Sequence, residues 1–272
     1  ALPKTLTTFL MPSLQDPLSR EEALSLPRSL TRHTFYCADW ADFDALPCAP
    51  EVLNLGLKSI LGDVEEFPTA FVPLKRLQEA RFSSVRQAVN FLAASPNLES
   101  IALIAGELDS LDFFRPEVAL AMSRRLQSLE LETTPSRSEL ENLPPSLTHL
   151  TLVGAKTQQQ QMLPFLSGLL PQLLRLELMS ILLPENWFSS LPPSLTSLYV
   201  EFVDPQRTLT ILDAQQLDTR CPNLATLHLI WTGDSQGLNF CPEALHHLPS
   251  KLEELKIIFP HALLDNPPDL DM

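Results

Sequence analysis

The histidines of this sequence are poorly spaced for metal binding or acid–base catalysis. In the repeat pattern described below, His149 and His228 fall three strands apart, and that separation of ~14 Å is too large for a shared metal ion. His246 and His247 are adjacent, and adjacent helical residues do not face each other, so we expect an exposed pair. The 7 glycines form no phosphate-binding loop, and no G-x-S-x-G turn is present. We therefore expect no catalytic residue, no metal site, no cofactor and no enzymatic activity.

Side chains suited to protein binding gather in the C-terminal part of the sequence. Tyr199 is expected between Glu177 and His228 on adjacent strands of one sheet. Aromatic residues and arginine among apolar neighbours are typical of interface hot spots. The alternative is an ordinary solvated sheet face that contains a Tyr–His cross-strand pair. The predicted partner-binding residues are Arg175, Glu177, Tyr199, Glu201, His228 and Ile230, with Met179 and Trp231 close by.

A short apolar frame, repeated along the chain, is expected to position these side chains. In the stretch LPPSLTHLTL, Leu147, Leu150 and Leu152 occupy positions 1, 4 and 6 of the frame, and the alternation predicts a strand with one buried face. Positions 4 and 6 are apolar in every copy except at His33. Positions 3, 5 and 7 should then point away from the core together. The eleven copies begin at Leu6, Leu30, Val52, Leu77, Leu98, Leu126, Leu147, Leu173, Leu195, Leu224 and Leu252.

With an L-x-x-L-x-L frame over nearly its whole length, the chain resembles the leucine-rich repeat family, whose period is ~20–29 residues. The resemblance implies an α/β solenoid, a curved horseshoe with a parallel β-sheet on the concave face and helices, 3₁₀ turns and loops on the convex face. It implies a single solenoid domain of about eleven repeats over residues 1–272, and we expect this to be a fragment of a longer chain. The sequence lacks the family's asparagine ladder at position 9, so the turns that leave the strands need other hydrogen-bond partners.

The intervals between the frames predict different connections. Long and short intervals alternate from Leu30 to Leu195, and only the longer ones can hold helices. We expect helices over Ser84–Ala94, with Ser84 as N-cap, and over Pro116–Leu129 and Pro242–Leu248, which open with proline. The shorter, proline-rich intervals leave room only for turns or 3₁₀ segments. Several frames are introduced by Leu-Pro-x-Ser-Leu-Thr and others by Ser/Cys-Pro-Asn-Leu.

The charge and cysteine content limit the class of partner. Lys plus Arg is 19 and Asp plus Glu is 33, which gives a formal net charge of −14. Phosphate backbones and anionic lipids require clustered cations, so we expect neither nucleic acid nor a membrane as partner. The 4 cysteines form no CxxC pair and are too few for a disulfide scaffold, which favours buried free thiols and an intracellular location. We expect the protein to be a monomer.

These features together favour a non-catalytic scaffold for protein–protein interaction that binds a protein partner on its concave face. The alternative is the targeting or substrate-recognition half of an enzyme-linked protein, such as a ubiquitin-ligase adaptor or a secreted effector. The Pro-Pro-Ser-Leu phrasing looks like the Leu-Pro-x repeats of secreted bacterial effectors, some of which carry a Cys-x-Asp nucleophile in a ligase domain. Cys37, Ala38 and Asp39 match those letters, but they follow the second frame with no separate helical domain. A passive structural protein is a third possibility.

Overall fold

A computed structural model of the chain describes residues 4–10, 21, 24–34, 52–54, 74–80, 85–103, 115–122, 124–132, 135–154, 166, 168–184, 186–203, 209–232 and 241–259. Every predicted frame contributes one strand. The strands are β1 (Thr8–Leu10), β2 (Arg32–Thr34), β3 (Val52–Asn54), β4 (Arg76–Ala80), β5 (Ser100–Leu103), β6 (Ser128–Leu131), β7 (His149–Val153), β8 (Arg175–Met179), β9 (Ser197–Phe202), β10 (Thr226–Trp231) and β11 (Glu254–Ile258). The helices are α2 (Val85–Ala94), α3 (Pro116–Ala121), α4 (Arg137–Leu140) and α5 (Ile211–Arg220), with 3₁₀ segments η4 (Trp187–Ser190) and η5 (Pro242–His247).

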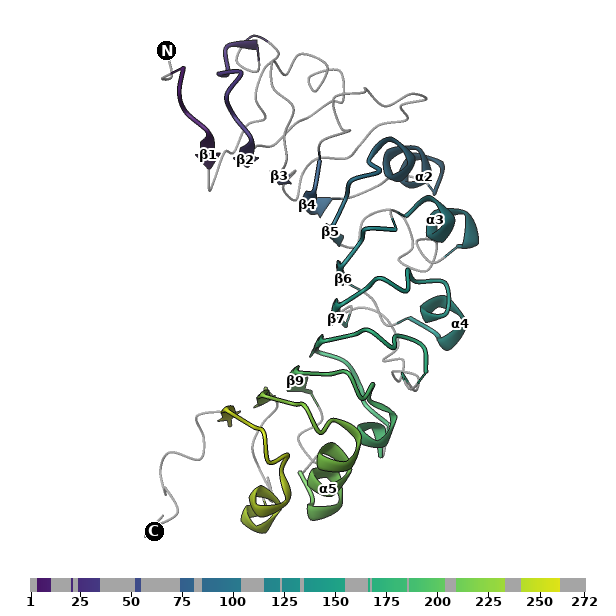
Figure 1. Cartoon of the computed structure of the whole chain (residues 1–272), viewed down its shortest axis with the longest axis vertical. Coiled ribbons are helices and arrows are strands. Elements are labelled where there is room, and N and C mark those ends of the chain that lie inside the picture. The colour runs from purple at the N-terminus through teal and green to yellow at the C-terminus, as the bar shows by residue number, and fades with distance from the viewer. Residues whose placement is uncertain are drawn as a thin grey trace. The chain divides into compact units, whose positions relative to one another are not determined.

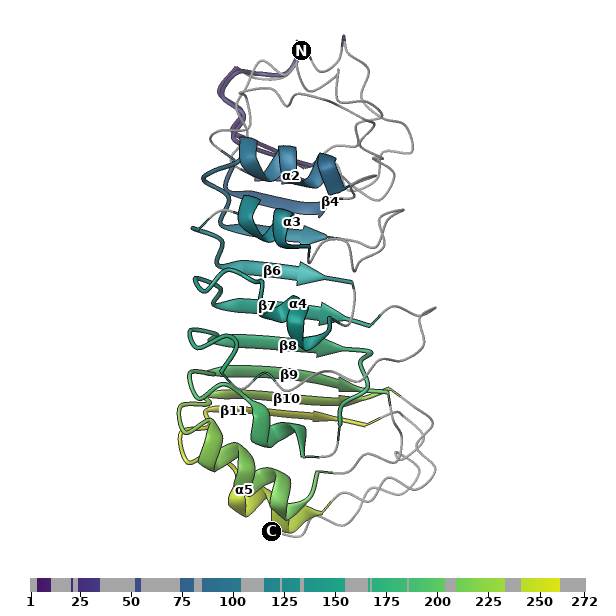
Figure 2. The ribbon, with the colours of Figure 1, turned by 90° about the vertical axis from the view of Figure 1, so that its right-hand side faces the viewer.

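The chain divides into two compact units, residues 1–133 with 138–147 and residues 134–137 with 148–272. The first unit contains β1–β6 and the second contains β7–β11. Within each unit, consecutive strands pair with each other, and all of these pairings are parallel. Figure 2 shows the strands of the second unit side by side with the same direction. Parallel neighbours that are consecutive in the chain require a connection that returns over one face of the sheet, which is the arrangement of a solenoid.

The core of the second unit is built from alternate residues of its strands. In β9 and β10 buried and half-buried residues alternate along all six positions. Leu198, Val200, Leu227 and Leu229, at frame positions 4 and 6, have 0% exposure, as the period of two predicts. Burying each of these side chains contributes about 1.5–3 kcal/mol. In Figure 1, α5 lies on the side of the sheet that these residues face, and none of the described helices covers the other side.

The register corrects the third frame. Leu53 in β3 pairs with His33 in β2, and Val52 pairs with Arg32, so Val52 occupies position 3 rather than position 1. The frame begins two residues earlier than predicted. Because the shift is even, Asn54 remains at an odd-numbered position of the frame, position 5 in place of position 3.

The fourth frame is shifted by three residues. Leu77 pairs with Ile101, which places it at position 4, and the fully buried Leu74 stands three residues before it. A bulge follows, after which Ala80 pairs with Leu103. The sequence contains two overlapping frames here, one with leucines at positions 1 and 4 and one with Ala80 at position 4. A frame with two leucines offers the larger apolar area for burial, and the pairing of β4 with β5 follows that frame.

Hydroxyl groups tie neighbouring repeats together where the strands begin. The serine of each Leu-Pro-x-Ser-Leu-Thr phrase donates to a carbonyl oxygen of the preceding repeat. These bonds are Ser29 to Leu6 at 2.7 Å, Ser146 to Leu126 at 2.7 Å and Ser194 to Leu173 at 2.6 Å. The phrase itself is a tight turn, in which the Leu195 N–H donates to the Pro192 carbonyl. The described repeats therefore have regular ties before the strand, whereas the family's asparagine lies after it.

The Ser/Cys-Pro-Asn-Leu phrase provides a second kind of tie at the same turn position. The side-chain carbonyl of Asn97 accepts a hydrogen bond from Arg125 at 3.0 Å, and that of Asn223 accepts one from Lys251 at 2.6 Å. In both pairs the donor is the residue just before the first leucine of the next frame. The two phrases thus share a role in joining successive turns.

The helices agree in part with the expectations from sequence. α2 lies within the predicted Ser84–Ala94 segment, although Ser84 is outside the described residues. α3 ends at Ala121, well before the predicted limit, and the predicted helix over Pro242–Leu248 is the 3₁₀ segment η5. α5 was not predicted. Within the described residues, none of the helices has the length and apolar character needed to cross a membrane.

A capping box begins α5. The Thr210 hydroxyl accepts a hydrogen bond from the Asp213 N–H at 3.1 Å, and the Asp213 carboxylate accepts one from the Thr210 N–H at 3.0 Å. Threonine followed three residues later by an acidic residue is a signal that the sequence contained. Ala214 and Leu217, one helical turn apart, are both fully buried.

Candidate binding face

The six residues predicted to bind a partner lie on the side of the second unit's sheet that α5 leaves open. Glu177 pairs in register with Tyr199, and Tyr199 pairs with His228 on the other side. Ile230 is opposite Glu201 in the same way. Arg175, Glu177, Tyr199, Glu201, His228 and Ile230 therefore share one face, and we refer to this set as the β8–β10 face. Whether it binds a partner remains a prediction.

One end of the β8–β10 face is held by an ion pair within a strand. The Arg175 guanidinium donates through Nε to Oε1 of Glu177 at 2.7 Å, and a second guanidinium nitrogen also contacts that oxygen. Oε2 of Glu177 accepts a longer bond of 3.4 Å from the Thr151 hydroxyl in β7. The arginine side chain is 54% exposed and the glutamate 17%. The positive charge of Arg175 is thus largely balanced within the face.

The aromatic centre of the face is a Tyr–His pair. The rings of Tyr199 and His228 meet edge to face, with centroids 6.2 Å apart and an angle of 67°. Nε2 of His228 lies 2.9 Å from a carboxylate oxygen of Glu254 in β11. Both rings are half-buried and belong to consecutive strands, so Tyr199 is held from one side by its neighbour.

The phenol of Tyr199 is surrounded by negative charge. Partial burial, followed by the carboxylates of Glu201 and Glu177, raises the pKa of Tyr199 above its usual value of 10.0. The hydroxyl therefore stays protonated at neutral pH and can donate a hydrogen bond. At the edge of the face, burial and the nearby Arg175 lower the pKa of His149, which favours its neutral form.

Glu201 has a different environment from the other carboxylates of the face. It accepts a 3.3 Å hydrogen bond from the neutral hydroxyl of Ser180. Ser180 has a left-handed backbone conformation (φ 55°), and its carbonyl oxygen would lie 2.0 Å from a Cβ placed on Gly154. The Gly154 N–H donates to the Met179 carbonyl at 2.7 Å. Only glycine permits this close approach between the ends of β7 and β8.

Trp231 does not belong to the face, which corrects the expectation that it would lie near the exposed site. Its side chain is 2% exposed and points into the core. It stacks between Phe202, at a centroid distance of 4.7 Å, and Phe259, at 5.0 Å. The three aromatic residues share frame position 8, which has the parity of the buried positions.

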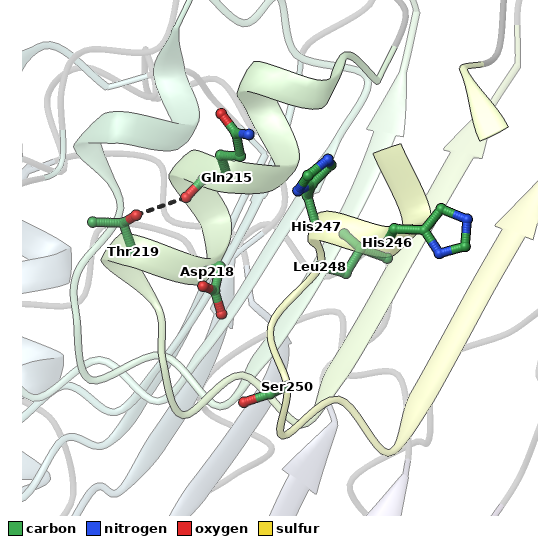
Figure 3. Close-up of a pocket in the computed structure, with 7 residues that line it drawn as sticks. All are labelled: Gln215, Asp218, Thr219, His246, His247, Leu248 and Ser250. Carbon is green, nitrogen blue, oxygen red and sulfur yellow. Dashed lines mark hydrogen bonds between the residues drawn. The ribbon is translucent and has the colours of Figure 1, made fainter. Parts of the chain in front are cut away.

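A hollow of about 560 Å³ lies between α5 and η5, and Figure 3 shows its lining. The His247 ring points toward Gln215, whereas the His246 ring points away from α5. Both histidines are exposed, as expected for a surface pair. Among the residues that the structure describes, no group of three or more His, Cys, Asp or Glu side chains could hold a metal ion.

Two of the 4 cysteines, Cys221 and Cys241, lie in the described part of the chain. Cys221 is a free thiol with 0% exposure, and burial raises its pKa to about 12. Its sulfur lies 3.5 Å from the Pro192 carbonyl. Cys241 is free and half-buried. The Cys37, Ala38 and Asp39 sequence lies outside the described residues.

Comparison with solved structures assigns the fold. The crystal structure of a complex of TLR13 with ssRNA13 matches 87% of this chain with a TM-score of 0.53 and 15% identity. A circular leucine-rich repeat protein, CroV588, is also matched over 88% of the chain, with 17% identity and a TM-score of 0.33. The chain spans 44% and 48% of those two chains, less than half of each. No protein-family model and no curated protein sequence matches. The chain has a leucine-rich-repeat type of fold, as the sequence predicted.

The sequence did not identify the polar residues that support the face. Thr151, Ser180 and Glu254 each bond to one of the six predicted residues. Thr151 and Glu254 occupy outward frame positions on the neighbouring strands, so the frame could have found them. Ser180 lies just after β8, where its left-handed backbone turns the side chain toward Glu201, and the frame does not predict this conformation.

Proposed function

We propose that this protein is a non-catalytic scaffold that binds a protein partner through the β8–β10 face. The observation that carries the proposal is the combination of a half-exposed tyrosine, an exposed arginine and apolar side chains on consecutive rungs of a sheet. Tyr199 lies in the middle, Arg175 is exposed at one end, and Ile230 and Met179 supply apolar surface. Residues of these types, held on a rigid sheet, are the usual anchors of protein interfaces.

The rigidity of the support favours binding without a large ordering cost. The face is carried by strands whose opposite side chains, such as Leu198 and Leu227, are fully buried. The Arg175–Glu177 and His228–Glu254 contacts favour one orientation of these side chains. Because less rotamer freedom is lost on association, such a surface needs fewer contacts for a given affinity.

A protein partner is favoured over nucleic acid. The TLR13 structure matched here contains single-stranded RNA, so RNA is a reasonable alternative to test. Phosphate binding requires cations that are free to make contacts. On the β8–β10 face Arg175 is paired with Glu177, and the formal net charge of the chain is −14. We therefore propose neither nucleic acid nor a membrane as partner. We also propose that the protein acts as a monomer inside the cell.

An enzyme-linked protein is the alternative. The chain spans 44% and 48% of the two solved chains named above, and recognition of a substrate for a separate catalytic domain would use the same β8–β10 face. In that case the residues described here would still bind a protein and would not catalyse a reaction. A catalytic domain encoded in the same full-length gene would support this alternative.

Affinity capture with two variants tests the proposal. The wild-type chain and Tyr199→Ala would be used in parallel to capture proteins, which are then identified and quantified by mass spectrometry. A stoichiometric partner of the wild type should be recovered at least tenfold less by Tyr199→Ala, since truncation of an aromatic hot spot costs about 2 kcal/mol or more. Gln215→Ala, an exposed change on α5, serves as control and should capture as the wild type does.

Two results would contradict the proposal. The first is equal recovery of every stoichiometric partner by the wild type and Tyr199→Ala. The second is tight binding of single-stranded RNA that depends on Arg175, measured by fluorescence anisotropy with labelled oligonucleotides.

A further inference from the structure

One row of outward side chains in the second unit is apolar apart from a single carboxylate. Val153 pairs in register with Met179, and Glu201 pairs with Ile230, which in turn pairs with Ile258. Leu178 is opposite Val200, so Met179 and Glu201 follow as the next neighbours. We call these five residues the apolar row. The side chain of Ile258 is 36% exposed, and the other four are half-buried.

The row beside it is polar, which makes the apolar row distinct. Its residues, one per strand from β7 to β11, are Thr151, Glu177, Tyr199, His228 and Lys256. A partner that covers the apolar row must therefore also pass close to Tyr199. Five side chains at a strand spacing of ~4.8 Å extend over a length on the order of 20 Å, enough for an extended segment of six or seven residues.

Glu201 is the charged member of the apolar row. The other two glutamates nearby, Glu177 and Glu254, each contact a basic side chain. Glu177 pairs with Arg175, and Glu254 contacts His228. Within the described residues, the hydrogen-bond partner of Glu201 is the neutral Ser180 hydroxyl. A carboxylate in this position keeps its solvation only while the surface around it is exposed to water.

We propose that the apolar row binds an apolar segment of a partner protein that carries one lysine or arginine, and that this cation pairs with Glu201. This proposal rests on the binding function proposed above and specifies the partner's chemistry. Apolar side chains of the segment cover Met179 and Ile230 and thereby remove water from the carboxylate between them. A buried carboxylate without a cation is strongly unfavourable, so a segment with an apolar or acidic residue at that point is rejected.

The surroundings of Glu201 support a cationic ligand. Partial burial is the main cause of the raised pKa of Tyr199, and the carboxylates of Glu201 and Glu177 add to it, which indicates a negative potential at the centre of the face. The Tyr199 ring, next to Glu201 in the sheet, offers a surface on which a guanidinium could stack. Arg175 in β8 does not supply this cation, because its guanidinium already pairs with Glu177 on the same strand.

Peptide display tests the proposal with a defined probe. Random twelve-residue peptides on phage would be selected on the immobilised full chain, and the affinities of the enriched peptides would be measured by fluorescence anisotropy. Peptides enriched on the wild type should combine apolar residues with one lysine or arginine. Glu201→Gln should weaken their binding at least tenfold, and replacement of the peptide's basic residue by norleucine should do the same. The two changes combined should cost little more than either alone.

The control is the same substitution at Glu243, an exposed glutamate of η5, which packs against α5 and lies away from the β8–β10 face. Glu243→Gln should change the affinity by less than threefold, and thermal melting should show that all variants fold. Peptides that lose affinity with Tyr199→Ala but keep it with Glu201→Gln would overturn the cation proposal while supporting the β8–β10 face as a binding site. A selection in which no enriched peptide depends on either residue would contradict both.

Discussion

At the residue scale, the β8–β10 face is defined by how charges are shared among neighbouring side chains. Arg175 and Glu177 balance each other within β8, and His228 contacts Glu254 across to β11. Glu201 is left with a hydroxyl partner, beside a tyrosine whose pKa it raises. The chemistry of the face therefore depends on Tyr199 and Glu201 more than on its ion pairs.

The titration of Tyr199 can be measured directly, since the protein contains 2 tyrosines. Its raised pKa means that the folded chain keeps a proton that the unfolded chain loses near pH 10. Stability should therefore fall as pH rises from about 10 toward the folded-state pKa. Absorbance at 295 nm should show a tyrosine that titrates above pH 10 in the wild type and disappears in Tyr199→Phe. Titration of that component at or below pH 10 would contradict the environment described for the face.

At the element scale, the sequence predicted the strands better than their connections. The leucine frame located eleven strands because burial on one face of a strand imposes a period of two. It misplaced the third and fourth frames because short apolar runs such as LKRLQEARF fit two registers, and only pairing with the neighbouring strand decides between them. α5 was missed although Thr210 and Asp213 had capping-box spacing.

The residues of the candidate face could be predicted wherever the frame gave the correct register. Tyr199, Glu177 and His228 are adjacent because their frames have the predicted register. Trp231 was misjudged because its position, one residue past the last outward-facing one, has buried parity. The role of Ser180 depends on a left-handed backbone conformation that rarely occurs in serine and has no simple sequence signal.

The contact between the ends of β7 and β8 predicts a large effect of a small change. Gly154→Ala places a methyl group against the backbone carbonyl of Ser180, which cannot move without disturbing the strand. We expect a loss of roughly 1–3 kcal/mol in the free energy of unfolding, measured by urea denaturation. Gly168→Asn is the comparison: a Cβ placed there meets no atom within 4 Å, so its cost comes from the φ of 81° alone, which asparagine adopts more readily than most residues, and the loss should be smaller. Equal stability of Gly154→Ala and the wild type would contradict the close approach.

At the scale of the whole molecule, stability in a solenoid arises from contacts between neighbouring repeats. The leucines at frame position 4 show this dependence in the second unit. Leu227 in β10, with described strands on both sides, has 0% exposure, whereas Leu255 in β11 is 40% exposed. The same residue at the same frame position is therefore expected to contribute very differently to folding.

Two matched truncations test this dependence. Leu227→Ala should lower the free energy of unfolding by about 2–5 kcal/mol, because it creates a cavity in a packed core. Leu255→Ala should cost about 1 kcal/mol or less, as expected for a largely exposed side chain. Denaturant unfolding of both variants gives the comparison, and similar losses for the two leucines would contradict the burial difference.

Binding of a protein partner on the β8–β10 face can be located in solution. The most direct measurement is photo-crosslinking from position 199, with p-benzoylphenylalanine introduced there and, in a separate chain, at position 215 on α5. The stoichiometric partner recovered by affinity capture should be crosslinked from position 199 and not from position 215. Crosslinking of that partner from position 215 alone would contradict binding on the β8–β10 face.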